Sequence, residues 1–288
     1  MSRWQLGRDY NKEVVYTPTS GLGFGLTVWA EMVRELILGR ELIWRLLLRD
    51  LSARYRQSVL GYVWAVLPAL GTVIMFTYIY DAKLLPIGKT DIPYPAYVLL
   101  GMTVWQLFAT GITATTQSLV GAGSLLSRVQ FLREALVLAA YGQSVLDFLI
   151  RLALVGIVFV WFHVVPAWTV FLVPFLLVPL MLLTLGLGFL LALANGVIRD
   201  VGNAVVLLVT YGMFLTPIVY PPPTKWPQVL VNYLNPVSPY IIATHDLTTK
   251  GTLSQPELLA WSCAASVVVF LIGWRVFHLA MPRIAERM

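Results

Sequence analysis

The sequence is poor in charged residues and contains a single cysteine. Only 12% of its 288 residues are Asp, Glu, Lys or Arg, about half of the roughly 25% that soluble domains carry. Hydrophobic residues make up 58% of the chain and the mean hydropathy is +0.78, so the composition excludes an ordinary water-soluble fold. Cys263 has no second cysteine with which to form an intrachain disulfide, and it therefore indicates no redox compartment.

The sequence motifs of several enzyme classes are also missing. Gly88-Lys89-Thr90 resembles the end of a phosphate-binding loop, but Lys83 stands where that loop needs a glycine, so we interpret the segment as a turn. The three histidines lack metal-ligand spacing, and neither HExxH nor Gly-x-Ser-x-Gly occurs. His245-Asp246 has the chemistry of an acid–base pair, although such neighbours are common by chance. We expect no catalytic site and no cofactor or metal bound by this chain.

Long apolar runs are what the sequence does have. A bilayer core about 30 Å thick needs roughly 20 apolar residues per helix, and six stretches meet or approach this length: 59–80, 97–120, 145–162, 170–194, 204–220 and 258–279. Residues 1–20 are polar, so no cleavable signal peptide is evident and the first span must insert the chain. The predicted fold class is an all-α integral membrane protein with six transmembrane helices.

Arginine is distributed unevenly among the segments that connect these stretches. Nearly all of it lies in segments 1–58, 121–144, 195–203 and 280–288. Three other connections contain lysine but no arginine between them: 81–96, 163–169 and 221–257. Because basic residues are retained on the cytoplasmic side of spans, both termini are predicted to be cytoplasmic. The net charge of +6 therefore reports topology and does not indicate a nucleic-acid partner.

The segment before the first span divides into two parts. Residues 1–21 are polar and are interpreted as a cytoplasmic arm. In residues 22–50, charged side chains recur mostly every three or four positions opposite tryptophan and aliphatic residues, which predicts an amphipathic helix lying in the membrane interface. The alternative is a soluble helix packed on a domain core, but the sequence contains no soluble domain. A cluster of arginines, Arg49, Arg54 and Arg56, lies directly before the first apolar run.

Residues 51–280 are predicted to form the six-span domain, followed by a cytoplasmic tail at 281–288. Its connection 121–144 should contain a short amphipathic cytoplasmic helix. The outer loop 217–257 is rich in proline, yet residues 226–234 are apolar, which predicts short half-helices that re-enter the outer leaflet under a cover of protein. Asp147 and Arg151 lie four residues apart at the start of the third span. Two interpretations are open: a local ion pair, or charges with a function in the membrane.

Aromatic residues are frequent in the first and fifth predicted spans. They allow two interpretations: ordinary lipid-facing or interfacial side chains, or a pathway in which sugar rings stack on aromatic faces. The residues concerned are Tyr62, Trp64, Phe76, Tyr78, Tyr80, Tyr211, Phe214 and Tyr220.

Five blocks of sequence resemble the permease subunits of ABC-2 type polysaccharide exporters. RDLSARYRQSVLGYVWAVLPAL (49–70) is similar to the entry and first span of that family, and FLREAL (131–136) to its first cytoplasmic loop, with Leu132 where proline is usual. NGVIRDVGNAV (195–205) resembles its second cytoplasmic loop. TPIVYP and LNPVSPY (216–221 and 234–240) resemble its outer-loop elements. The blocks keep the family's order, and the long N-terminal arm is similar to the O-antigen and teichoic-acid branch.

The resemblance implies a membrane subunit without an ATP site of its own. Such permeases are homodimers bound to two copies of an ATPase subunit, which holds ATP and Mg²⁺, in the bacterial cytoplasmic (inner) membrane. A coupling helix would lie within 124–136 and contact the ATPase through Arg128, Phe131, Leu132, Arg133 and Glu134. Arg199 and Asp200 would lie in the second cytoplasmic loop.

The resemblance also implies where a substrate passes. Arg54, Tyr55 and Arg56 would form the entrance for a polyprenyl-pyrophosphate-linked glycan, whose phosphates suit guanidinium groups. The first and fifth spans would line the channel of the dimer, with Tyr62, Trp64, Phe76, Tyr78, Tyr211, Phe214 and Tyr220 along it.

The predicted function is export of a lipid-linked polysaccharide such as O-antigen or teichoic acid, and the chain itself is not an enzyme. An exporter of drugs or lipids with the same fold is the first alternative, against which the entry motif argues. An ion-coupled carrier should show ionisable residues near mid-span and inverted repeats. A membrane-embedded transferase would need convergent His, Asp or Glu residues, which the sequence lacks.

Overall fold

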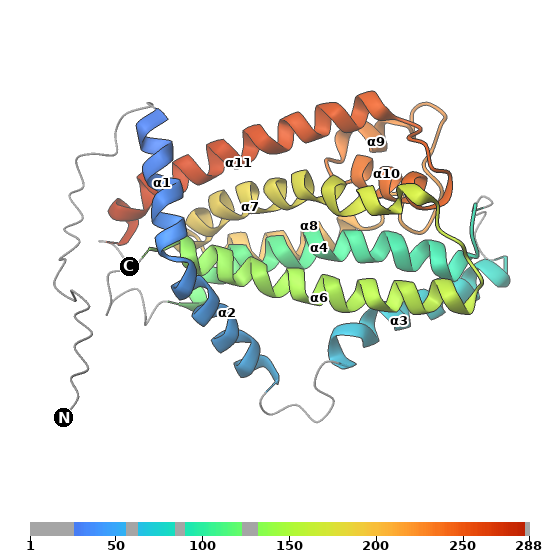
Figure 1. Cartoon of the computed structure of the whole chain (residues 1–288), viewed down its shortest axis with the longest axis horizontal. Helices are drawn as coiled ribbons and strands as arrows, with labels where there is room; N and C mark the ends of the chain where they lie inside the picture. The colour runs from blue at the N-terminus through green and yellow to red at the C-terminus, as the bar shows by residue number, and fades with distance from the viewer. Residues whose placement is uncertain (1–25, 56–62, 84–89, 123–131, 286–288) are drawn as a thin grey trace, which may run out of the picture.

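The computed structural model describes residues 26–55, 63–83, 90–122 and 132–285, and over these ranges the secondary structure is helical without strands. Four long helices run along the long axis of the molecule (Figure 1): α4 (Tyr94–Gly121), α6 (Glu134–Trp161), α7 (Val173–Val197) and α11 (Pro256–Ala285). Among the described residues these four, with α7 extended back to Trp168, are long and apolar enough to cross a membrane. They confirm the second, third, fourth and sixth predicted spans.

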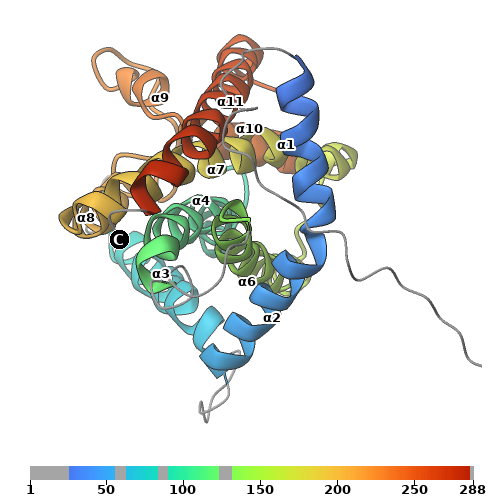
Figure 2. The ribbon, with the colours of Figure 1, turned by 90° about the vertical axis from the view of Figure 1, so that its left-hand side faces the viewer.

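Helix α4 lies at the centre of the bundle. It packs against α6, α7, α3 and α8, and the view along the bundle shows it enclosed by them (Figure 2). Most of its residues are buried, whereas a smaller share of α6, α7 and α11 is buried within the chain, which leaves surface on these three helices for lipid or a partner. Chain direction alternates, so α4, α7 and α11 end where α6 and α8 begin; we call this the inner end, following the predicted topology.

Two helices occupy the remaining predicted spans. Helix α3 (Val63–Asp81) coincides with most of the first stretch, and residues 59–62 lie outside the described residues. Helix α8 (Asp200–Gly212) has 13 residues, or about 20 Å at 1.5 Å per residue. The prediction of a continuous helix over 204–220 was wrong, since the chain turns repeatedly after Gly212. The count of six crossings remains a prediction.

Pro217 explains part of this early ending. Proline removes a backbone donor and disfavours helical backbone in the residue before it. The Thr216 hydroxyl donates to the Gly212 carbonyl at 2.7 Å and accepts from Asn235 Nδ2 at 2.6 Å. These bonds satisfy polar groups at the end of α8 and tie the following turns to the outer segment.

The predicted single helix at 22–50 is instead two helices, α1 (Leu26–Leu38) and α2 (Arg40–Tyr55), separated at Gly39. A Cβ added at Gly39 would lie 2.9 Å from Cδ2 of Leu132, so this residue is placed where a larger side chain would collide with the start of α6. The buried side of the pair also packs on protein: Met32, Leu46 and Leu47 join the same apolar cluster as residues of α6, α7 and α11. In Figures 1 and 2, α1 crosses the inner end, and α2 starts in contact with α6 and then diverges from it.

The opposite, outer end is closed by short helices: η1 (Trp168–Leu172), α9 (Leu230–Leu234) and α10 (Ser238–Thr249). Helix α10 is buried along nearly its whole length, between α4, α7, α11 and η1. Its end is held by the Ala167 amide, which donates to the Thr248 carbonyl at 2.8 Å. Short helices in this loop were predicted; their insertion into the outer leaflet remains a prediction.

Candidate functional site

The inner end brings together the start of α6, the end of α11 and α1. Glu134 is the first residue of α6, its side chain is 7% exposed, and its Oε1 lies 2.9 Å from Nδ1 of His278 on α11. Arg133 donates from Nη1 to the Met281 carbonyl at 2.9 Å. We call Arg133, Glu134, His278 and the Met281 carbonyl the inner junction.

The inner junction changes the interpretation of the coupling residues. The sequence suggested that Arg133 and Glu134 offer their charges to a partner, whereas the structure engages both in contacts within the chain. Leu132 lies against Gly39, at the point where α1 meets α2. Arg128 and Phe131 lie outside the described residues. A role of these five residues toward an ATPase remains a prediction, and any such role for Glu134 must act through its place in the junction.

Helix α1 adds further contacts at the same end. Burial raises the pKa of the Glu35 carboxyl; His278 opposes this shift, and the charges of Glu134 and Glu31 add to it. Arg275 approaches the Met32 sulfur at 3.8 Å, and the rings of Trp29 and Trp274 meet edge to face at 5.9 Å. The last turns of α11 therefore contact both α1 and the residues that begin α6.

The connection between α7 and α8 is organised by Asn195, the first residue of the NGVIRDVGNAV block (195–205). Its side chain is 4% exposed. Nδ2 donates to the Thr116 carbonyl at 3.0 Å and Oδ1 accepts from the Gly202 amide at 2.8 Å, so one residue joins the ends of α4 and α7 to the start of α8. The sequence analysis assigned Asn195 no role of its own; its place in that block and the following Gly196 were its sequence signals.

The two charged residues predicted in this connection, Arg199 and Asp200, are both exposed. Asp200 is in the first turn of α8, where a negative charge is favoured by the helix dipole. Neither residue has a salt-bridge partner among the described residues. Both are therefore accessible to a partner at the inner end.

The predicted entrance lies at the end of α2. Arg54 and Tyr55 have helical backbone, and their side chains and all of Arg56 lie outside the described residues. Just before them, Arg49 is paired with Asp50 at 2.7 Å. The entrance remains a prediction, but its first two residues continue a helix that the sequence analysis ended at residue 50.

The predicted pathway aromatics do not share one environment. Phe76 is buried in the core beside α4. Tyr78, Tyr211 and Phe214 are mostly exposed, at 70%, 66% and 52%, on α3 and α8 or just after it. Tyr220 is partly buried and donates its hydroxyl to the Phe214 carbonyl at 3.2 Å. Tyr62 and the Trp64 side chain lie outside the described residues. Helices α3 and α8 both pack on α4, away from α1 (Figure 2).

The His245-Asp246 pair at the outer end does not form an acid–base dyad. The His245 ring is buried and stacks on Tyr97 with centroids 4.1 Å apart, and neither ring nitrogen has a hydrogen-bond partner among the described residues. Burial lowers the His245 pKa to about 3, although the charge of Asp246 opposes this shift.

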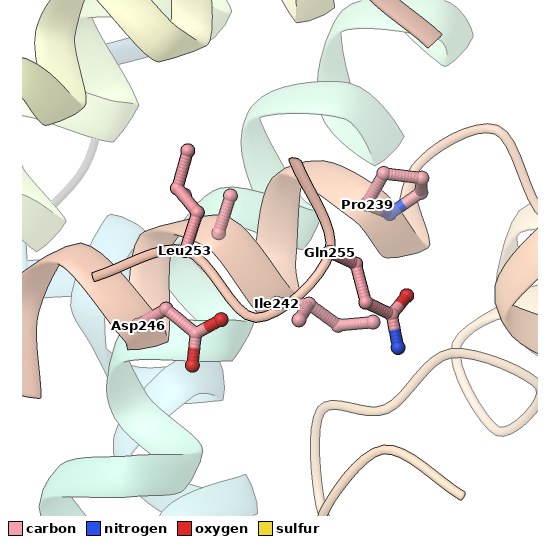
Figure 3. A pocket seen from close by; sticks show the side chains of 6 residues that line it. Pro239, Ile242, Asp246, Leu253 and Gln255 are labelled. Carbon is pink, nitrogen blue, oxygen red and sulfur yellow. The ribbon is translucent and has the colours of Figure 1, made fainter. Parts of the chain in front are cut away.

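The Asp246 carboxylate is already satisfied by its neighbours. It accepts from Lys250 at 3.0 Å and from the amide and hydroxyl of Ser254, and Lys250 also lies 3.3 Å from Asp91. The hollow beside it (Figure 3) is mainly apolar, and its lining is Pro239, Ile242, Ala243, Asp246, Leu253 and Gln255. The described residues contain no group of three metal-ligating side chains.

Comparison with known proteins gives consistent matches. Residues 41–246 match the family model described as ABC-2 type transporter. The chain is 27% identical over 259 residues to the O-antigen export system permease protein RfbA of Myxococcus xanthus, covering 88% of this chain and 98% of that protein. Two proteins of the same name from Klebsiella pneumoniae are 24% and 23% identical over 245 residues, covering 83% of this chain and 91% of each of them.

Proposed function

The chain belongs to the ABC-2 type transporter family, and on that premise we propose that it is the transmembrane subunit of an ATP-driven exporter of a lipid-linked polysaccharide. The observation that carries the proposal is the agreement of three relatives, all named O-antigen export system permease, over at least 83% of this chain. The four membrane-length helices of the structure fit four of the six spans proposed for such a subunit.

The energy source is a separate ATPase subunit. The sequence contains no GxxxxGK[ST] motif, and a permease of this family works as the transport component of an export system. The described surface of this chain suited to that partner is the inner end, where Arg199 and Asp200 are exposed. The connection between α4 and α6, with Arg128 and Phe131, completes the proposed contact.

The substrate is an anionic lipid-linked glycan of the O-antigen or teichoic-acid type. Its pyrophosphate would meet Arg54 and Arg56 beside the inner leaflet, because a guanidinium group donates two parallel N–H···O bonds to phosphate oxygens. The placement of Arg54 at the end of α2, directly before the first span, supports this entrance.

Two copies of the chain form the channel in this proposal. Tyr78, Tyr211 and Phe214 are exposed on the single chain, and α8 is too short to cross the hydrocarbon core alone. A second copy facing α3 and α8 would cover these aromatic side chains and present some of them to the passing sugar.

Deletion of the coding sequence in its own bacterium tests the proposal. We expect loss of polysaccharide from the cell surface and accumulation of the lipid-linked polymer inside the cell, with recovery on re-expression of the intact chain. Unchanged surface polysaccharide together with altered export of a drug or an unglycosylated lipid would contradict the proposal and favour the alternative exporter class.

A further inference from the structure

Two adjacent residues at the start of α6 are bonded to two residues near the end of α11. We infer that the inner junction transmits movement of the connection between α4 and α6 to α11 and α1, which makes Glu134 and His278 positioning residues for the coupling of ATP hydrolysis to export. The inference deepens the proposed function and depends on it, since it needs a partner that pushes on this connection.

The geometry of the inner junction suits transmission because it has two contact points. Glu134 Oε1 and His278 Nδ1 are 2.9 Å apart, and Arg133 Nη1 donates to the Met281 carbonyl at 2.9 Å. An ionised carboxylate can only accept, so the ring donates from Nδ1. His278 and Met281 lie three residues apart, on one face of α11. Two bonds a turn apart restrict both sliding and rotation of α11 against the start of α6.

Burial makes the inner junction different from the surface ion pairs of the same chain. The Glu134 and His278 side chains are 7% and 27% exposed, whereas Glu41 and Arg45 on α2 form a pair that is 74% and 75% exposed. Exposed ion pairs compete with water and contribute little to stability. Loss of the donor at His278 instead leaves a buried carboxylate with one partner fewer, so the contact resists separation.

Helix α11 links the inner junction to α1 and α7. Its residues Trp274 and Arg275 touch Trp29 and Met32 of α1. Further along, α11 lies so close to α7 that a Cβ added at Gly186 would be 2.6 Å from the Phe270 Cα. Backbones packed at this distance move together, since interiors transmit strain. A displacement at the start of α6 therefore reaches α1, α11 and α7.

The test uses the complete complex, with its ATPase subunit, in lipid vesicles, and measures glycan exported per ATP hydrolysed. His278→Leu removes the donor, and His278→Asn keeps an N–H donor close to the position of Nδ1. We expect His278→Leu to lower the ratio at least about threefold, as substitutions along a coupling route do, while the complex still assembles and hydrolyses ATP. His278→Asn should restore most of the ratio, and the exposed control Arg45→Gln should not change it.

Glu134→Met provides a second variant if His278→Leu does not assemble, because it keeps the length of the side chain but removes the carboxylate acceptor; it should lower the ratio in the same way. An unchanged ratio in the assembled variants overturns the inference. A parallel fall of export, hydrolysis and melting temperature also overturns it, since that result describes a purely structural contact. Failure of the wild-type complex to export glycan would instead refute the proposed function.

Discussion

Asn195 lies nearly buried where α4, α7 and α8 meet, and both ends of its amide are used. Replacement by alanine leaves the Thr116 carbonyl and the Gly202 amide without these partners. A buried group left unpaired costs about 1–3 kcal/mol, so Asn195→Ala should lower the free energy of unfolding by that amount. The melting temperature of the purified chain in detergent measures the effect. The exposed neighbour Asn203 provides the control Asn203→Ala, and equal melting temperatures for the two variants would contradict the prediction.

His245 predicts a dependence of stability on pH. Burial lowers the pKa of His245 in the folded chain to about 3, below the ordinary value of 6.5. Between these two values the ring is protonated in the unfolded chain and neutral in the folded chain. The contribution to stability is therefore complete above pH 6.5 and falls by about 1.4 kcal/mol per pH unit below it, down to the folded pKa.

Melting temperatures from pH 7.5 to 5 test this prediction. His245→Phe can still stack on Tyr97 but cannot titrate, so its melting temperature should fall less steeply with decreasing pH than that of the wild type. The exposed His163 provides the control His163→Asn, which should keep the wild-type slope. A wild-type slope in His245→Phe would show that the buried ring is not responsible.

At the scale of elements, α7 and α11 depend on a close approach of their backbones at two glycines. A Cβ at Gly273 would collide with the backbone of Gly186, and one at Gly186 with that of Phe270. Backbone atoms cannot rotate away, so Gly273→Ala must separate the helices, at a cost of about 1–3 kcal/mol or more.

Thermal unfolding in detergent checks this prediction, with Gly156→Ala on α6 as the control. A Cβ at Gly156 meets nothing within 4 Å, so this change should leave stability unchanged or raise it through helix propensity. Similar melting temperatures for Gly273→Ala and the wild type would show that the two helices can separate without loss.

The elements that could be predicted from the sequence are those that composition alone determines. Helices α4, α7 and α11 coincide with apolar runs because twenty apolar residues in a bilayer have few alternatives to a helix. The ends were harder, because tertiary contacts decide them. Helix α6 begins at Glu134, eleven residues before the predicted start, where the inner junction satisfies its first polar side chains. The close approach of Leu132 to Gly39 likewise joins residues that are distant in sequence.

In the candidate site, too, local sequence patterns could be predicted and contacts between distant residues could not. Order and spacing of short blocks were enough to predict the family, which the match over residues 41–246 confirms. The internal bonding of Arg133 and Glu134 could not be predicted, because their partners lie 148 and 144 residues away. The local sequence pattern does not distinguish a charged residue that faces a partner protein from one that contacts another helix of its own chain.

At the scale of the whole molecule, the chain is a helical bundle around α4 with four helices of membrane length, and in the proposed function it works only as part of a larger complex. Its outer end is closed by the buried helix α10, and its inner end gathers exposed charge and the junction between α6, α11 and α1. In the proposed assembly, a second copy would cover the exposed aromatic side chains of α3 and α8, and a separate ATPase subunit would supply the ATP site.

The most direct test of this account is reconstitution of the purified chain in lipid vesicles with and without its ATPase subunit, measuring ATP hydrolysis and translocation of a lipid-linked glycan together. The account predicts no hydrolysis by this chain alone, and hydrolysis coupled to glycan translocation once the ATPase is added. Robust ATP hydrolysis by the chain alone, or glycan translocation driven by an ion gradient without the ATPase, would contradict it.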